Sequence, residues 1–167
     1  SLGLVGSEMC IRDRFYEINE QDASKLKQGG TLNLSTYSLG PDFNRFSQNG
    51  SSTSVSETMG VIAGAGIWRS TFKGEDELDP NYCLGFEAKE VDGKITAEVR
   101  LNPKAVFNDG TPIDIDALKA TWQIQRDPDG EYKIAAAGIY EYIESVEAID
   151  GDRYHARVVF KLSLIHI

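Results

Sequence analysis

Three acidic side chains lie within one short stretch of the sequence, FNDGTPIDIDALKATW. They are Asp109, Asp114 and Asp116. Carboxylates are among the residue types best suited to catalysis. Neighbouring carboxylates can act as general acid and base or as a nucleophile. No motif for a nucleophile or a partner base accompanies them, and turn formation and helix capping account for all three. We therefore predict no catalytic residue, and a carboxylate-dependent hydrolase stays an alternative.

Other residues able to react or to bind metal are isolated. The stretch DPDGEY, residues 127–132, has oxygen donors but not the spacing of a calcium loop, which favours a turn. His155 and His166 have no partner at metal-ligand spacing. Cys83 lacks an activating neighbour and is predicted to be a buried apolar residue, while Cys10 forms no C-x-x-C pair with it. The sequence thus predicts no metal and no cofactor.

Composition narrows the class of protein. The 167 residues suit one domain, and the formal net charge is −9. A nucleic-acid partner would require clustered Lys and Arg, so none is predicted. No apolar run approaches the length that spans a bilayer.

A strand-to-helix joint positions the three acidic residues. The turn at 108–110 follows a strand-like pair, Val106-Phe107, and Pro112 disfavours helix at the residue before it. Asp114 is a good N-cap, and Asp116 meets the positive end of the helix dipole. One helical face then carries the apolar residues Ile115, Leu118 and Trp122.

Two hairpins are predicted on either side of this joint. Asp92-Gly93 suits a two-residue turn in which Ala88 faces Ala97 and Phe86 faces Val99. A second hairpin at DGD, residues 150–152, is predicted to have a three-residue loop. Its pairs are Ala148 with Tyr154 and Val146 with Ala156, with His155 on the polar face.

The N-terminal half is less regular. Residues 15–29 read as a linker, and TLNLSTY, residues 31–37, as a half-buried strand. A long loop rich in Gly, Pro, Asn and Ser follows. Helical periodicity runs over about 55–71, with Ser54 or Ser56 as the cap, and Trp68 and Trp122 are expected in the core. Hairpins mixed with helices indicate an α/β or α+β protein.

Both ends differ from the middle. SLGLVGSEMCIRDR at the start and the last residues, LSLIHI, resemble translated sequencing adapter. We expect residues 1–14 and 163–167 to be non-native.

A longer stretch, ITAEVRLNPKAVFNDGTPIDIDALKATW, resembles the signature region of the family 5 extracellular solute-binding proteins, the oligopeptide- and dipeptide-binding type that serve ABC importers. The shared features are Lys104, Val106-Phe107, the D-G-T-P turn at 109–112 and the helix from Asp114. YIESVEAIDGDRYHARVVFKL resembles the family's next hairpin, and GGTLNLSTY its first strand. Departures from the family pattern are Asp114 in place of Thr, Ala117 in place of an acid, and Asn108 where His is common.

The resemblance implies an α/β fold with hairpins, a mixed sheet and flanking helices. Residues 30–162 would form the N-terminal part of lobe I of a bilobed, type II periplasmic-binding-protein-like structure. It also implies a non-enzymatic, monomeric binding protein that captures peptides or similar small solutes and delivers them to an ABC permease. The location implied is periplasmic or on the cell surface as a lipoprotein, and the chain shows no export signal.

By family position, the loop after the first strand borders the ligand cleft. Its backbone groups can hydrogen-bond a peptide, and its aromatic rings can pack on peptide side chains. A core role for Phe43 and a solvated loop are the structural alternative. The predicted ligand-binding residues are Tyr37, Ser38, Leu39, Gly40, Phe43 and Asn44.

Besides the hydrolase, a receptor module that keeps the fold without transport is a further alternative. Turnover abolished by Asp109→Asn would favour the hydrolase. A gene adjacent to permease and ATPase genes would favour transport over the receptor module.

Overall fold

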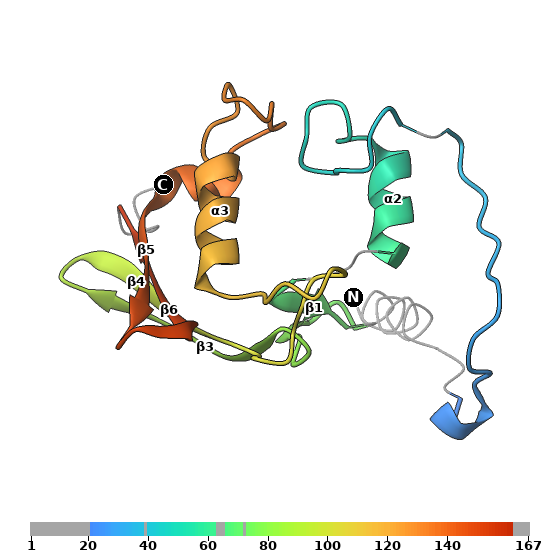
Figure 1. Cartoon of the computed structure of the whole chain (residues 1–167), viewed down its shortest axis with the longest axis horizontal. Helices are drawn as coiled ribbons and strands as arrows, with labels where there is room; N and C mark the ends of the chain where they lie inside the picture. The colour runs from blue at the N-terminus through green and yellow to red at the C-terminus, as the bar shows by residue number, and fades with distance from the viewer. Residues whose placement is uncertain (1–20, 39, 63–65, 72, 162–167) are drawn as a thin grey trace, which may run out of the picture. The chain divides into compact units, whose positions relative to one another are not determined.

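The computed structural model describes residues 21–38, 40–62, 66–71 and 73–161 (Figure 1). The chain divides into two units. The first comprises the residues up to Ser35 together with Ser70–Asp76, and the second comprises Thr36–Arg69 and the chain from Glu77 onward. Within the described ranges, no helix has both the length and the apolar character needed to cross a membrane.

The strand predicted for residues 31–37 is absent, so that prediction is wrong. The segment is extended, and Leu32 and Leu34 are 76% and 58% exposed. A strand needs a neighbouring ladder to satisfy its backbone groups, and no described residue supplies one to this segment. The sequence does alternate apolar and polar residues here, but this alternation alone does not pair the segment with a neighbouring strand. In the first unit, a short 3-10 helix, η1 (Ala23–Lys25), precedes this segment, and the Asp22 side chain caps it.

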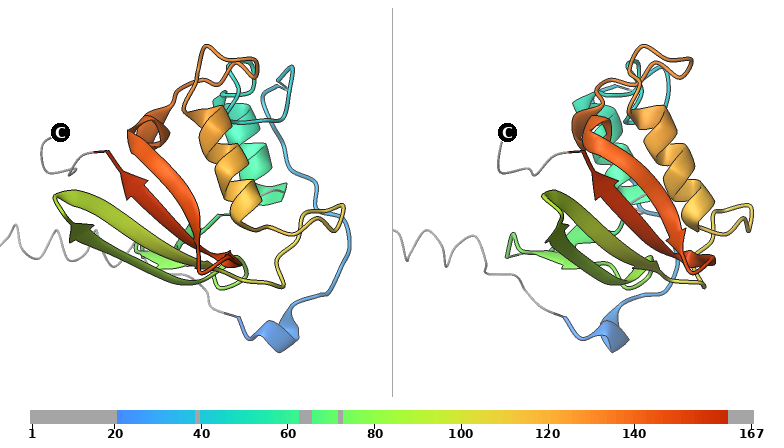
Figure 2. Two further views of the ribbon diagram at one scale, coloured as in Figure 1. Left: turned by 60° about the vertical axis from the view of Figure 1, so that its left-hand side comes forward. Right: turned by 90° about the vertical axis from the view of Figure 1, so that its left-hand side faces the viewer.

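A four-stranded antiparallel sheet is the main element of the second unit. Its strands are β3 (Cys83–Val91), β4 (Lys94–Leu101), β5 (Ile143–Ile149) and β6 (Asp152–Phe160), in the spatial order β3-β4-β6-β5. Figure 2 shows these strands side by side with α3 (Ile115–Gln125) over one face. The predicted α/β class with hairpins and flanking helices is confirmed, but every pairing within this four-stranded sheet is antiparallel, in place of the mixed sheet that was expected.

The first hairpin has the predicted register. Ala88 pairs with Ala97 and Phe86 with Val99. Asp92 and Gly93 take φ values of 53° and 77°, the two positive angles that a type I′ turn requires. The inward residues of β4, Ala97, Val99 and Leu101, are buried.

The second hairpin corrects the prediction of a three-residue loop. Asp150 and Gly151 form a two-residue turn with φ values of 53° and 70°, and Ile149 pairs with Asp152. A register shift then places Ala148 opposite Ala156, and Val146 opposite Val158. The extra residues of β6 form a β-bulge, which restores the match of apolar faces that a two-residue turn alone would break.

The core lies between the sheet and α3. A buried cluster includes Cys83, confirmed as a buried apolar residue, and Trp122 packs against this cluster as predicted. The Arg126 guanidinium lies over the Trp122 ring, 4.7 Å from the ring centroid. The buried members of the cluster are Cys83, Val99, Leu101, Ile115, Ile143, Val146 and Ala156. A 3-10 helix, η2 (Gly138–Tyr142), precedes β5.

The predicted helix over 55–71 is too long. The helix α2 spans Thr53–Ile62, and the chain becomes a strand, β1 (Trp68–Ser70), before the predicted end. At its start, the Ser52 hydroxyl accepts the Val55 N–H at 3.3 Å, so Ser52 caps the helix in place of Ser54 or Ser56. Gly66 lies after the helix, consistent with the low helical propensity of glycine.

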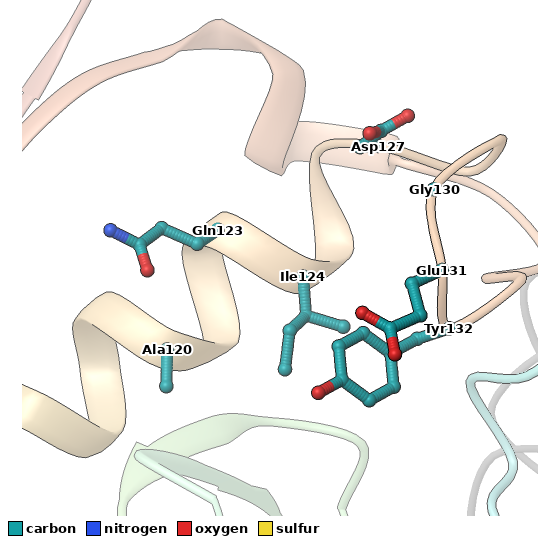
Figure 3. Close-up of a pocket in the computed structure, with 7 residues that line it drawn as sticks. All are labelled: Ala120, Gln123, Ile124, Asp127, Gly130, Glu131 and Tyr132. Carbon is teal, nitrogen blue, oxygen red and sulfur yellow. The ribbon is translucent and has the colours of Figure 1, made fainter.

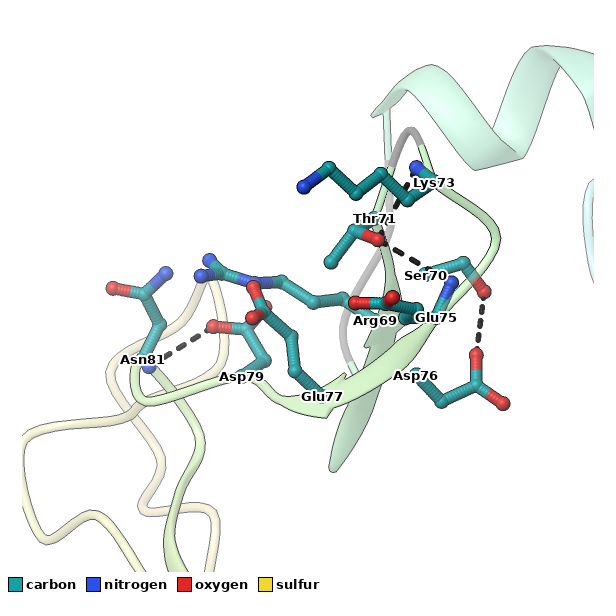
Figure 4. A network of polar contacts seen from close by, with 9 residues as sticks. All are labelled: Arg69, Ser70, Thr71, Lys73, Glu75, Asp76, Glu77, Asp79 and Asn81. Carbon is teal, nitrogen blue, oxygen red and sulfur yellow. Dashed lines mark hydrogen bonds and ion pairs between the residues drawn. The ribbon is translucent and has the colours of Figure 1, made fainter. Parts of the chain in front are cut away.

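Trp68 belongs to the short strand β1, so its helical assignment is wrong. The residue is 50% exposed, and its ring meets Phe86 edge-on at 5.1 Å. Two-stranded pairing of β1 with β2 (Asp76–Leu78) requires extended backbone here. Surface hydrogen bonds support this hairpin (Figure 4): Ser70 donates to Asp76 at 2.7 Å, and Arg69 pairs with Glu77 at 2.7 Å.

Candidate functional site

The joint that carries the three acidic residues folds as the sequence predicts. Gly110 has a φ of 86°, which completes the turn, and Val106 forms an isolated antiparallel bridge with Pro112. The Asp109 carboxylate accepts the Thr111 N–H at 2.9 Å. This hydrogen bond, with a smaller side-chain contribution from Thr111, lowers the pKa of Asp109.

Asp114 caps α3 and also holds a distant part of the chain. Its Oδ1 accepts the Asp116 N–H at 2.9 Å, as predicted for an N-cap. Its Oδ2 accepts a hydrogen bond from Arg153 Nε at 2.8 Å, and the Arg153 Nη2 atom also bonds this oxygen. Arg153 was not predicted from the sequence, because no local pattern connects two residues that lie 39 positions apart.

The environment of Asp114 keeps it charged. Burial, which leaves the residue 4% exposed, acts to raise its pKa. The hydrogen bond and positive charge of Arg153, together with backbone N–H groups at the helix start, outweigh burial, so the pKa of Asp114 lies below its ordinary value. A general acid requires the opposite shift, so neither Asp114 nor Asp109 has the character of one.

The predicted ligand residues lie on an irregular loop, and two aromatic rings stand out from it. Tyr37 is fully exposed, and Phe43 is 54% exposed, so the core alternative for Phe43 is wrong. Gly40 packs so close to Val55 that an added Cβ would lie 2.7 Å from a Val55 methyl. Asn44 accepts the Phe46 N–H through its side chain at 3.0 Å. Ser38 is exposed, and Leu39 lies outside the described residues.

The same loop forms backbone hydrogen bonds with the segment that follows α3. Ser47 forms a bridge with Ile134, and two backbone hydrogen bonds flank it. Gln48 N donates to Lys133 O at 2.8 Å, and Ala135 N donates to Phe46 O at 2.9 Å. The structure thereby brings the part of the loop that follows Phe43 and Asn44 beside residues 133–135. The sequence carries no signal for this pairing, since neither segment has a strand pattern.

A hollow of about 430 Å³ lies on α3 next to that segment (Figure 3). One side is formed by Ala120 and Ile124 of the helix, and the other by Glu131 and Tyr132 of the following turn. Tyr132 is 62% exposed. The full lining is Ala120, Gln123, Ile124, Asp127, Gly130, Glu131 and Tyr132. This surface combines apolar and aromatic side chains with two carboxylates.

The DPDGEY stretch is a turn, as predicted. Gly130 N donates to Asp127 O at 3.1 Å, and the Lys133 ammonium donates to Asp129 O at 3.0 Å. No group of three or more His, Cys, Asp or Glu side chains suited to a metal ion occurs among the described residues. His155 lies on the polar face of the sheet, with its Nε2 atom 3.6 Å from Glu98 Oε2.

Comparisons with known proteins identify relatives of this chain. No family model matches it. It is 29% identical over 140 residues to the "Oligopeptide-binding protein OppA" of Mycobacterium tuberculosis, covering 82% of this chain and 23% of that protein. It is 28% identical over 144 residues to the "Oligopeptide-binding protein AppA" of Bacillus subtilis, covering 86% of the chain and 24% of that protein. The chain therefore spans about a quarter of the length of the curated relatives it matches.

A solved structure supports the fold. The protein described as "Periplasmic EDTA-binding protein EppA" superposes with a TM-score of 0.62 at 23% identity, over 71% of this chain and 22% of that one. Its fold agrees with the arrangement of sheet and helix described above. The predicted resemblance is thus confirmed: the chain is similar to the oligopeptide-binding proteins OppA and AppA over more than four fifths of its length.

Proposed function

We propose that this chain is part of an extracytoplasmic solute-binding component of an ABC importer, and that it captures peptides or similar small solutes. The observation that carries the proposal is its similarity to two proteins named as oligopeptide-binding, over more than four fifths of its length. In this proposal the chain binds the solute and catalyses no reaction. A membrane permease receives the solute, and the location is periplasmic or at the cell surface.

The exposed aromatic rings support a binding role for the loop. Tyr37 and Phe43 present apolar area to solvent without joining the buried cluster of the sheet. Such rings suit a peptide whose side chains are apolar. We propose Tyr37, Ser38, Leu39, Gly40, Phe43 and Asn44 as ligand-binding residues, as the family position implies.

The hydrolase alternative finds no support in the acidic joint. Asp109 and Asp114 are occupied by hydrogen bonds that hold the turn and the helix start, and the pKa of each is lowered. The relatives are named as binding proteins, which favours capture over catalysis.

Calorimetric titration with pentaalanine tests the proposal. The wild-type chain is expected to bind this peptide, and the double variant Tyr37→Ala, Phe43→Ala is expected to lose about tenfold or more in affinity. Leu84→Ala is the matched control, because Leu84 is also 54% exposed but lies on β3. Equal affinity of all three proteins would show that the loop is not part of the ligand site. Failure of the wild-type chain to bind any peptide would contradict the capture of peptides.

A further inference from the structure

A network of hydrogen bonds runs inside the loop that carries Phe43 and Asn44. Asp42 is at its centre: Oδ1 accepts the Asn44 N–H at 2.8 Å, and Oδ2 accepts the Ser47 hydroxyl at 2.7 Å. The Ser47 hydroxyl oxygen in turn accepts the Gly50 N–H at 2.9 Å. Ser47 N also donates to Asn44 O at 3.0 Å. One half-buried carboxylate therefore connects both ends of the loop.

Gly50 allows the loop to close on itself. The residue is buried, and a Cβ placed on it would collide with the Asn44 carbonyl and with the Asp42 carboxylate. Only glycine leaves room for this close approach of two backbone segments. The position of Asn44 is thus defined by Asp42 on one side and by the Gly50 backbone on the other.

The ordered loop has no role in the core of the sheet. None of Asp42, Ser47 and Gly50 belongs to the hydrophobic cluster between the sheet and α3, nor do the residues packed against that cluster include them. Ordering a polar surface loop costs conformational entropy, and this loop gains little apolar burial in return. A loop ordered before its ligand arrives, however, binds with a smaller entropic loss.

We propose that Asp42 is a positioning residue for solute capture: through Asn44 and Ser47 it holds the loop in the conformation that presents Phe43 and the neighbouring backbone to the ligand. The inference rests on the proposed function and adds to it the residue that preorganises the site. Asp42 touches no ligand in this account, and it acts through the residues it bonds.

Four variants separate positioning from simple stability. Asp42→Ala removes both acceptors, and Ser47→Ala removes the acceptor of Gly50. Asp42→Asn is the conservative variant, because its amide oxygen can accept from Asn44 and its amide nitrogen can donate to the Ser47 hydroxyl. Asp152→Ala is the matched control: the Asp152 carboxylate accepts a similar local hydrogen bond, from Tyr154 N at 2.9 Å, in the hairpin of β5 and β6.

Amide hydrogen exchange of each variant reports on the loop, and calorimetric titration with pentaalanine reports on capture. In Asp42→Ala and in Ser47→Ala, the Gly50 amide is expected to exchange about tenfold faster, with exchange at Val99 and Ala156 unchanged. Pentaalanine affinity is expected to fall about tenfold in Asp42→Ala and to return in Asp42→Asn. Asp152→Ala should alter neither the Gly50 amide nor the affinity.

Each contrary result has its own meaning. Unchanged exchange at Gly50 in both Asp42→Ala and Ser47→Ala would show that the network does not order the loop, and would overturn the inference whatever the ligand. Faster exchange with undiminished affinity would make the network structural only and would also overturn it. If the wild-type chain binds no pentaalanine while Gly50 exchange still depends on Asp42, the proposed function fails, and the ligand-positioning role of Asp42 fails with it.

Discussion

The sheet with its joint to α3 and the N-terminal stretch of residues 31–52 differ in what determines their structure. In the first hairpin a short-range rule suffices: two positive φ angles at Asp92 and Gly93 set the register from the turn as far as the pair Gly85–Arg100. In the N-terminal stretch, the alternating leucines form no strand, and the loop is held by Asp42 and by a bridge to Ile134. Local pattern therefore predicted the first hairpin, whose partner residues are near in sequence, and carried no signal for the loop, whose partner is remote.

The largest effect is expected where the loop meets its remote partner. Ile134 is 2% exposed, and it bridges Ser47. Replacing it with alanine is expected to destabilise the chain by about 3 kcal/mol, because a buried aliphatic side chain is lost and a cavity remains. Urea unfolding measures the change.

The control for that substitution is Ile139→Ala. Ile139 is 51% exposed, so its truncation is expected to change the free energy of unfolding by less than about 0.5 kcal/mol. Equal effects of the two substitutions would show that Ile134 does not anchor the loop, and the contrast between local and remote determinants would weaken.

A second substitution breaks the joint of the well-predicted region. Asp114→Ala removes the helix cap and leaves Arg153 without its partner, for an expected loss of about 2 kcal/mol in the free energy of unfolding. Asp114→Asn retains a capping oxygen and should lose less. Thermal unfolding of both variants compares the contribution of the helix cap to stability with that of the Asp114 charge. An unchanged stability in Asp114→Ala would contradict the role given to the joint.

The same pair carries a pH dependence. The folded-state pKa of Asp114 lies below its ordinary value, so its stabilisation is complete above that ordinary value and is lost as pH falls through the folded-state pKa. The stability difference between wild type and Asp114→Asn should therefore be constant above about pH 5 and should shrink in stronger acid. A difference that grows on acidification would contradict the ion pair with Arg153.

Turn glycines supply a smaller test of the local rules. Gly151 has a φ of 70°, so Gly151→Ala is expected to cost about 1 kcal/mol. Gly85→Ala is the matched control, since Gly85 lies in β3 without a positive φ, and an added Cβ would meet only Arg100 Cβ at 3.7 Å. Chemical unfolding of the two variants compares them, and a larger loss in Gly85→Ala would argue against turn geometry as the determinant.

The smallest effect is expected in the extended segment. Leu32 and Leu34 are largely exposed, so the double substitution Leu32→Ser, Leu34→Ser should change the stability of this chain by less than about 0.5 kcal/mol. Circular dichroism during thermal unfolding provides the measurement. A loss above about 1 kcal/mol would mean that the leucines are buried in solution, and the strand predicted from their alternation would be restored.

The sequence allowed the first hairpin, the Asp114 cap and the buried Cys83 to be predicted, because each follows from a turn, a cap or a residue type. The β-bulge of β6 was not predictable, since the extra residues look like ordinary strand residues. The strand at Trp68 was missed because its residues continued a helical period. Arg153 and Ile134 were missed for a different reason, namely that tertiary contacts at long separation leave no local signal.

The candidate ligand site was predictable only through resemblance to a family. Nothing in the periodicity around Tyr37 or Phe43 indicates a ligand, and their exposure became visible only in the structure. The hollow beside Tyr132 also had no sequence signal, because it depends on how the turn after α3 folds back on the helix.

Site-resolved nuclear magnetic resonance of the wild-type chain during titration with pentaalanine tests the central claim most directly, since it reports where a peptide binds. We predict that amide shifts change in residues 37–44, and that they stay constant on the polar face of the sheet at Glu98 and His155. Shifts confined to the polar face of the sheet, or no shifts at any peptide concentration, would contradict the account.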